Sequence, residues 1–161
     1  MPTRNLGGNE VICTDDEDLR ALLQELTAGK GTERAIDCVA GDLGAEIARN
    51  LAPAGTMLVY GALSSHRQTD PAKFVMPLFA PRLIYSTATV RGWWLPRWVP
   101  SQPLSEVRAA TSDLLAMLSK GALTPPASVR YSVKDFQEAV RLADGEAGQE
   151  KVLLDFSERA S

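Results

Sequence analysis

The sequence offers few side chains for acid–base or nucleophilic chemistry. Ser64, Ser65 and the single histidine, His66, are neighbours in the chain. Neighbours in sequence rarely form a catalytic triad, and no G-x-S-x-G turn surrounds these three. A solvated loop is therefore the better interpretation of this segment. The sequence also does not predict a pair of carboxylates in one apolar pocket, which acid–base catalysis could use. We name no catalytic residue in this chain.

Metal-binding and redox motifs are also missing. The chain has two cysteines, Cys13 and Cys38, and no CxxC, HExxH or Cys/His cluster. A structural or catalytic zinc site built from this chain is therefore not expected. Both cysteines lie in short apolar runs, which is typical of buried, unpaired thiols in a reducing compartment.

Glycine-rich phosphate turns are absent as well, because Gly7 and Gly8 precede a predicted strand instead of following one. The carboxyl ends of the predicted strands are better candidates, since ligands of open parallel sheets bind there. Small residues at these ends let a ligand approach backbone amides and carbonyls, and tryptophans add a flat apolar wall. The candidate positions are Val39, Ala40 and Gly41; Tyr60, Gly61, Ala62 and Leu63; and Gly92, Trp93, Trp94 and Leu95.

The same residues also have a purely structural interpretation. Gly61 can simply end a strand, and Trp93 and Trp94 can fill a core or an interface. The residue pattern alone leaves both interpretations open.

The elements that would position these residues follow an α/β order, in which short apolar runs alternate with helical stripes. Strands are expected at residues 11–13, 35–39, 57–60, 83–90, 129–131 and 151–155. The first helix is expected after a capping box of Thr14 and Glu17, with Leu19, Leu22, Leu23 and Leu26 on one face. Further helices are expected after Asp42 with Leu43, Ile47, Ala48 and Leu51 inward, from about Leu104 to Lys120 with Val107, Leu114, Leu115 and Leu118 inward, and after Ser132.

The composition is that of a single globular domain covering residues 1–161. Apolar residues make up 45% of the chain and charged residues 23%, with a net charge of −3. This balance gives no electrostatic footprint for nucleic acid or for an acidic membrane surface. No window approaches the ~18 apolar residues of a membrane span, and the start of the chain does not read as a signal or transit peptide. We therefore expect a cytoplasmic protein.

Four stretches together resemble the medium-chain dehydrogenase/reductase superfamily, in its zinc-independent branch of quinone reductases and 2-enoyl thioester (enoyl-CoA) reductases. Their order and spacing agree with that family over nearly the whole chain. The pairing of Tyr60-Gly61 with the Arg-Gly-Trp-Trp-Leu run favours the enoyl thioester reductases. The stretches are LGGNEVI at 6–12, IDCVAG at 36–41, GTMLVYG at 55–61 and RGWWL at 91–95.

The resemblance implies a cofactor site for NADPH, or for NADH, at the strand ends. In that group, segments like 60–63 and 93–95 contact the nicotinamide end of the cofactor, and a lysine at the start of the last strand, similar to Lys151, does so too. Ala62 and Leu63 stand where Gly and Met are common, and Trp93 where Phe is common. These contacts are made largely through the backbone. The implied cofactor-binding residues are Tyr60, Gly61, Ala62, Leu63, Trp93, Trp94, Leu95 and Lys151.

The resemblance also implies that the chain corresponds to the C-terminal half of such an enzyme. The family begins with a catalytic domain, followed by a strand, the glycine-rich pyrophosphate turn, a helix and the strand that selects the ribose phosphate. We therefore expect a truncated, partial Rossmann-like parallel sheet with flanking helices that lacks the first βαβ unit. The family's strand order, 3-2-1-4-5-6, places the missing strands between residues 11–13 and residues 35–39.

The leading hypothesis is thus the C-terminal part of an NADPH-dependent enoyl thioester reductase, which is inactive alone. The alternative is a non-catalytic α/β interaction module or pseudoenzyme remnant, or a quinone oxidoreductase-like fragment. We expect a homodimer or an upstream partner chain that supplies the catalytic domain. Two open strands, at residues 83–90 and 35–39, are the edges through which self-association is expected.

Overall fold

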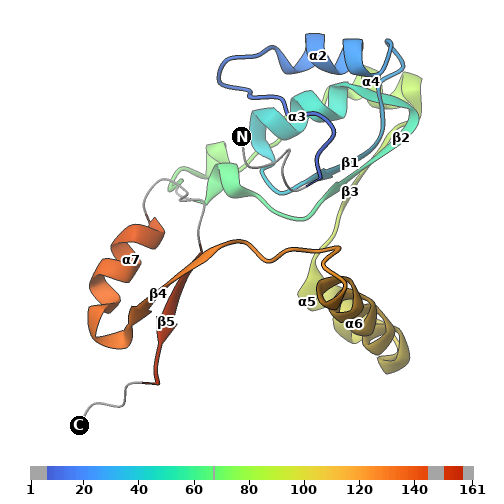
Figure 1. Ribbon diagram of the computed structural model, residues 1–161. Coiled ribbons are helices and arrows are strands. Elements are labelled where there is room, and N and C mark those ends of the chain that lie inside the picture. The colour runs from blue at the N-terminus through green and yellow to red at the C-terminus, as the bar shows by residue number, and fades with distance from the viewer. Residues whose placement is uncertain (1–6, 67, 145–150, 158–161) are drawn as a thin grey trace. The chain divides into compact units, whose positions relative to one another are not determined.

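The computed structural model of the chain describes residues 7–66, 68–144 and 151–157 (Figure 1). The chain divides into two compact units, Met1–Pro103 and Leu104–Ser161, and each is described by itself. Within the described residues, no helix is both long enough and apolar enough to cross a bilayer.

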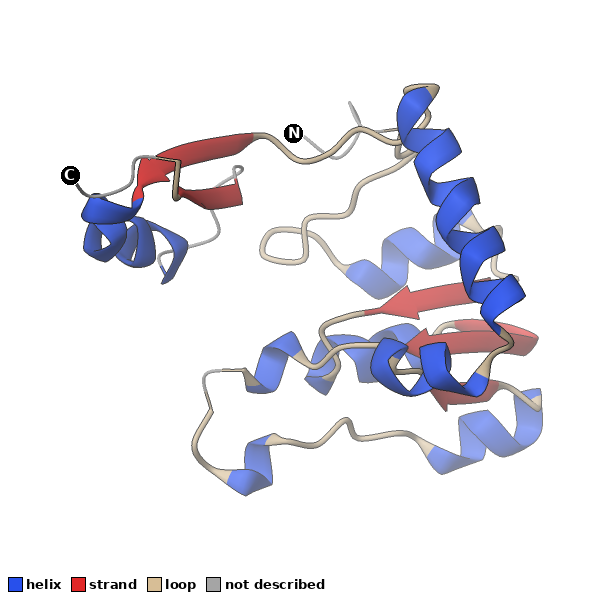
Figure 2. Cartoon of the chain, turned by 90° about the horizontal axis from the view of Figure 1, so that it is seen from below, coloured by secondary structure: helices blue, strands red, loops and turns tan. Residues whose placement is uncertain are grey.

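The first unit is built on three parallel strands in the order β1-β2-β3 (Figure 2). Helix α3 connects β1 to β2, and α4 precedes β3. This arrangement confirms the expected α/β fold with a parallel sheet and flanking helices. The elements of this unit are α2 (Leu19–Leu26), β1 (Thr32–Asp37), α3 (Gly41–Arg49), β2 (Leu51–Val59), α4 (Ala80–Ser86), β3 (Thr89–Gly92) and α5 (Leu95–Ser101).

One face of this sheet forms the core. Met57 on β2 is aligned with Ala35 on β1 and with Val90 on β3, and all three side chains belong to the same apolar cluster. Ala48 of α3 and the fully buried Leu51 complete it. Because side chains alternate along a strand, the neighbouring positions 36, 58 and 91 belong to the opposite face of the sheet.

The expected strand at residues 83–90 is wrong. Residues Ala80–Ser86 form helix α4, Thr87 takes a left-handed conformation with φ 52°, and β3 covers only Thr89–Gly92. Pro81 lies in the first turn of α4, where its fixed φ suits a helix. The Arg82 side chain then ties the helix to the start of β2, because its Nη2 donates to the Leu51 carbonyl at 2.7 Å. Pro81 at the start of α4, the left-handed Thr87 at its end and this long-range bond override the β-rich composition.

The expected strand at residues 11–13 is absent too, and so is the capping box after it. The Cys13 carbonyl accepts from the backbone N–H groups of Asp16 and Glu17, which closes a turn. Glu17 reaches back to accept from the Cys13 N–H at 2.6 Å. Helix α2 begins instead at Leu19, capped by Asp18, whose carboxylate accepts from the Ala21 N–H at 3.0 Å.

The border between α3 and β2 also differs from the expectation. Helix α3 ends at Arg49, so Leu51 is the first residue of β2 and not the last apolar position of a helix. The pairing with β1 jumps from Thr32↔Leu51 to Arg34↔Thr56. Residues 52–55 are therefore looped out of the ladder. Strand β1 likewise ends at Asp37, two residues before its expected end.

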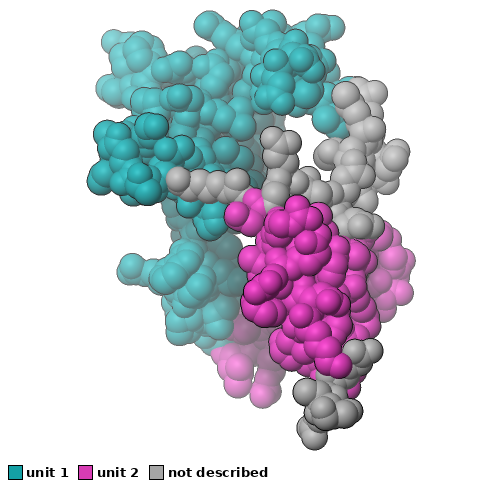
Figure 3. Space-filling model, turned by 90° about the vertical axis from the view of Figure 1, so that its left-hand side faces the viewer, with its two compact units in different colours: residues 1–103 teal, residues 104–161 magenta. Residues whose placement is uncertain are grey.

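The second unit is drawn in magenta in Figure 3. Its described residues form a pair of parallel strands and two α-helices. Strands β4 and β5 are aligned from Ser128↔Lys151 to Ser132↔Asp155, and Ala139 of α7 is buried. Helix α6 has no fully buried side chain. Leu114, Leu115 and Leu118 are exposed, so their expected inward positions are wrong, whereas Val107 is half-buried. The elements are α6 (Leu104–Ser119), β4 (Ser128–Ser132), α7 (Phe136–Asp144) and β5 (Lys151–Asp155).

Candidate functional site

The loops that follow β1, β2 and β3 meet at the carboxyl edge of the three-stranded sheet. The backbone N–H groups of Tyr60 and Leu63 donate to the carbonyls of Asp37 and Cys38, at 2.8 and 3.1 Å. The Trp93 N–H donates to the Val59 carbonyl at 2.8 Å. The structure therefore brings the predicted segments 60–63 and 93–95 to one edge of one sheet.

Asp37 shapes the loop after β1. Its side chain is only 3% exposed. Oδ1 accepts from the N–H groups of Val39 and Ala40 at 2.8 and 3.1 Å, and Oδ2 accepts from the same Ala40 N–H at 3.1 Å. The carboxylate thus satisfies the backbone of the turn into α3. Ala40 has φ 57° and ψ −148° at this turn, a conformation that L-residues rarely adopt.

Gly61 lies directly against the loop after β1. A Cβ atom at position 61 would be 2.7 Å from the Cys38 carbonyl oxygen and 3.1 Å from its Cα. These are backbone atoms, so no rotamer change could relieve the contact. The glycine is required for close approach of two loops, and it fixes the backbone that leads to Ala62.

The Tyr60 phenol is held at the same edge. A hydrogen bond with the Cys38 side chain, and the charge that this thiol carries when ionised, raise the pKa of Tyr60 above its ordinary value. Partial burial and the Asp37 carboxylate act in the same direction. At neutral pH, Tyr60 is therefore a protonated hydrogen-bonding group that remains partly exposed.

The two tryptophans differ in their surroundings. Trp93 is half-buried and packs on Trp98, with ring centroids 6.2 Å apart at an interplanar angle of 47°. Trp94 is the residue before α5, and its side chain is 66% exposed. The structural interpretation thus applies to Trp93, while Trp94 has a free ring face. Leu63 and Leu95 are exposed beside these loops as well.

Lys151 belongs to the second unit, so it is not described together with the other predicted residues. It is the first residue of β5 and is exposed, and its backbone N–H donates to the Ala127 carbonyl at 2.6 Å. The sequence predicted a last strand that starts at Lys151, and β5 starts there.

Asp37 has no role predicted from the sequence, and Cys38 was expected only as a buried, unpaired thiol; in the structure its side chain is half-buried. Asp37 holds the turn that supports the edge, and the Cys38 backbone lies against the position of Gly61. The Cys38 thiol raises the pKa of Tyr60. The available signal was an acidic residue at a strand end followed by small residues, which is typical of a side chain that bonds to its own turn. The thiol contact had no sequence signal.

A parallel sheet with flanking helices and an open carboxyl edge defines the class of this unit as a Rossmann-like cofactor domain. The sequence pattern of the family described as zinc-binding dehydrogenase matches residues 6–154. The chain therefore belongs to that family, within the medium-chain dehydrogenase/reductase superfamily that the four stretches resemble.

Individual relatives agree with this assignment. The chain is 28% identical over 134 residues to the mitochondrial enoyl-[acyl-carrier-protein] reductase of Bos taurus, covering 83% of this chain and 34% of the relative. The corresponding Rattus norvegicus protein is 30% identical over 106 residues, covering 66% and 26%. The crystal structure of a Bacillus thuringiensis protein assigned as an NADPH:quinone reductase superposes with a TM-score of 0.79 at 25% identity, covering 94% of this chain and 44% of that one. The chain thus spans about a third of the length of these curated relatives.

The family description refers to zinc, and the described residues do not fit a zinc site. Among residues 7–66, 68–144 and 151–157, no group of three His, Cys, Asp or Glu side chains is close enough to hold a metal ion. Four such ligands, or three with an open position, are what zinc requires. No metal chemistry is assigned to these residues.

Proposed function

We propose that residues 60–63 and 93–95 hold the nicotinamide end of NADPH as part of an enoyl thioester reductase. The observation that carries the proposal is the contact of Gly61 with the Cys38 backbone, which fixes a loop beside exposed apolar side chains at the carboxyl edge of a parallel sheet. The relatives named as enoyl reductases and as an NADPH:quinone reductase support this choice of ligand.

Each residue has a distinct part in this proposal. The Ala62 carbonyl already accepts from the Ser65 N–H at 3.0 Å and from the Ser65 hydroxyl at 2.8 Å. The groups proposed to bond a carboxamide are therefore the backbone amides of Gly61 and Ala62. The Trp94 ring offers a flat apolar surface, and the protonated Tyr60 phenol follows the neighbouring strand β2 as a hydrogen-bonding group.

The cofactor itself would supply the hydride chemistry. This chain's residues bind and orient the ring, and we assign to them no proton transfer to substrate. The names of the relatives support a 2-enoyl thioester as the proposed substrate class. Because the proposed contacts involve only one end of the cofactor, we expect a dissociation constant for the 161-residue chain in the millimolar range, equivalent to a binding free energy of about −4 kcal/mol.

The test is to record amide chemical shifts during titration with the two halves of the cofactor. Reduced nicotinamide mononucleotide should shift the signals of residues 60–63 and 93–95, whereas 2′-phospho-AMP should leave them in place. Trp94→Ala should weaken binding of the mononucleotide, and Trp98→Phe, which keeps an aromatic partner for Trp93, should not. If only the adenosine half shifts these signals, or if neither does, the proposal is wrong.

One observation favours the alternative of an interaction module. Helix α6 exposes Leu114, Leu115 and Leu118 together, and an exposed apolar surface of this kind is typical of a protein contact. Loss of self-association in Leu115→Lys, with unchanged response to the mononucleotide, would assign α6 to assembly and leave the cofactor proposal intact.

A further inference from the structure

A second potential site lies at the opposite end of the sheet from the cofactor edge. A cavity of about 780 Å³ is lined by Gly29, which precedes β1, by Arg49 and Asn50, which precede β2, and by Tyr85 of α4. All of its lining residues belong to the first unit. Since β1 runs from Thr32 to Asp37 between the two ends, they are separated by roughly 17 Å.

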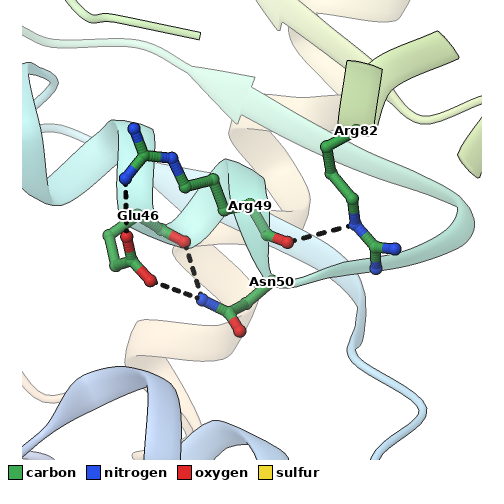
Figure 4. A network of polar contacts seen from close by, with 4 residues as sticks. All are labelled: Glu46, Arg49, Asn50 and Arg82. Carbon is green, nitrogen blue, oxygen red and sulfur yellow. Dashed lines mark hydrogen bonds and ion pairs between the residues drawn. The ribbon is translucent and has the colours of Figure 1, made fainter. Parts of the chain in front are cut away.

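The lining carries more positive than negative charge. Three arginines, from α2, α3 and α4, line the cavity together with one carboxylate, Glu46. Glu46 is already engaged, because its Oε2 pairs with Arg49 Nη1 at 3.2 Å and its Oε1 accepts from the buried Asn50 amide at 3.1 Å (Figure 4). In the part of the chain that the structure describes, no carboxylate pairs with Arg20 or Arg82.

Arg82 is held in place by neutral groups. Its Nε donates to the Arg49 carbonyl at 3.1 Å (Figure 4). Its Nη2 donates to the Leu51 carbonyl at 2.7 Å. These bonds orient the guanidinium without neutralising it, and about three of its five N–H groups remain for a ligand. Because the side chain is ordered before any ligand arrives, less conformational entropy is lost on binding.

Aromatic rings complete the lining. Phe79 precedes α4 and Tyr85 lies within it, and both are exposed, Tyr85 to 87%. Nothing within the described fold requires two such rings beside unpaired arginines. A ligand with a flat ring can pack on them, while a doubly charged group can bond to guanidinium forks.

We propose that this cavity is a binding site for an aromatic monophosphate, held by Arg20 and Arg82 through the phosphate and by Phe79 and Tyr85 through the ring. A volume of this size suits a small organic ligand, for which pockets of roughly 300–1,000 Å³ are usual. The proposal does not depend on the cofactor site, because it uses other residues at the other end of the sheet.

The test compares four probes by fluorescence and amide chemical-shift titration of the full chain. We expect 1-naphthyl phosphate and AMP to shift signals around Arg20, Arg82 and Tyr85, and to bind at least about tenfold more tightly than inorganic phosphate or 1-naphthol. If 1-naphthyl phosphate binds more tightly than AMP, the preferred ligand has its ring joined directly to the phosphate. If AMP binds more tightly, the ring and the phosphate are joined through a sugar. Binding should weaken as salt is added.

Arg20→Gln is the decisive variant, since this exposed side chain has no described partner whose loss could unfold the chain. It should weaken 1-naphthyl phosphate binding by about tenfold. Arg108→Gln, which removes the same charge from a helix of the second unit, should leave it unchanged. The proposal is overturned if Arg20→Gln and Arg108→Gln bind 1-naphthyl phosphate equally well. It is also overturned if inorganic phosphate binds as tightly as 1-naphthyl phosphate, or if the chemical-shift changes are confined to residues 60–63.

Discussion

Gly61 is the single residue on which the geometry of the cofactor edge depends most directly. In Gly61→Ala, the new Cβ would be 2.7 Å from the Cys38 carbonyl oxygen, so the two loops must separate. We expect the free energy of unfolding to fall by about 1–3 kcal/mol, as in other overpacked sites. Urea denaturation measures this.

The matched control is Gly92→Ala, at the end of β3, where a Cβ would meet nothing within 4 Å. Its effect should stay within about 0.5 kcal/mol. Equal losses in the two variants would show that glycine flexibility, and not the contact with Cys38, is what matters at position 61.

The Tyr60–Cys38 contact gives a pH-dependent prediction. A pKa raised in the folded state favours the neutral phenol. The protonated Tyr60 phenol therefore contributes fully to the free energy of unfolding below its unfolded-state pKa, which is near 10. This contribution is lost as the pH rises through the higher folded-state pKa. In Cys38→Ala the pKa of Tyr60 should move down toward its ordinary value.

Absorbance of the phenolate measures this titration, and Tyr60→Phe identifies which of the three tyrosines is responsible. Cys38→Ser, which keeps a hydrogen-bonding side chain, should retain part of the shift. An unchanged titration in Cys38→Ala would mean that the thiol does not interact with the phenol in solution.

At the scale of elements, the turn from β1 into α3 stores backbone strain. Ala40 has a positive φ without the freedom of glycine, a conformation that costs about 1–3 kcal/mol. Ala40→Gly removes that cost and adds back about 0.4–1 kcal/mol of chain entropy in the unfolded state. We expect the variant to be more stable by about 1 kcal/mol in urea denaturation. Ala21→Gly, inside α2, should instead lose about 1 kcal/mol.

The success of sequence reasoning varied between elements for physical reasons. The bounds of strand β5 (Lys151–Asp155) and helix α6 (Leu104–Ser119) were predicted closely, because a short apolar run marks the first and Pro103 and Gly121 flank the second. The segment at 83–90 was predicted as a strand, because its β-branched composition masks the helix. The bond from Arg82 to Leu51 that ties α4 to β2 joins residues far apart in sequence, so no local pattern contains it.

The candidate site shows the same division. The sequence correctly placed segments 60–63 and 93–95 after strands, and a parallel sheet brings such ends together. The sequence could not show that Trp93 packs on Trp98 while Trp94 stays exposed. The two tryptophans are identical neighbours just before α5, so no local pattern tells them apart. That distinction depends on three-dimensional packing alone.

At the scale of the molecule, the first unit covers only one face of its sheet. Met57 faces the α3 side and is fully buried, while Ile36, on the opposite face of β1, is 73% exposed. Leu58 is its aligned neighbour on β2. The outer edges of β1 and β3 also have no strand partner among the described residues. Apolar surface and open backbone donors next to each other favour association with another chain.

We therefore expect the 161-residue chain to self-associate at tens of micromolar. The two open edges are those of β1 and of β3 at Thr89–Gly92; β3 replaces the strand expected at residues 83–90. Light scattering coupled to size exclusion should show species larger than the monomer. Ile36→Lys should shift the population toward the monomer, because a charge on that face opposes burial. Ile84→Lys, at a comparably exposed isoleucine of α4, should shift it less. A single monomeric species at every concentration would show that the open sheet face is stable in water, and equal effects of the two variants would assign association to α4 instead.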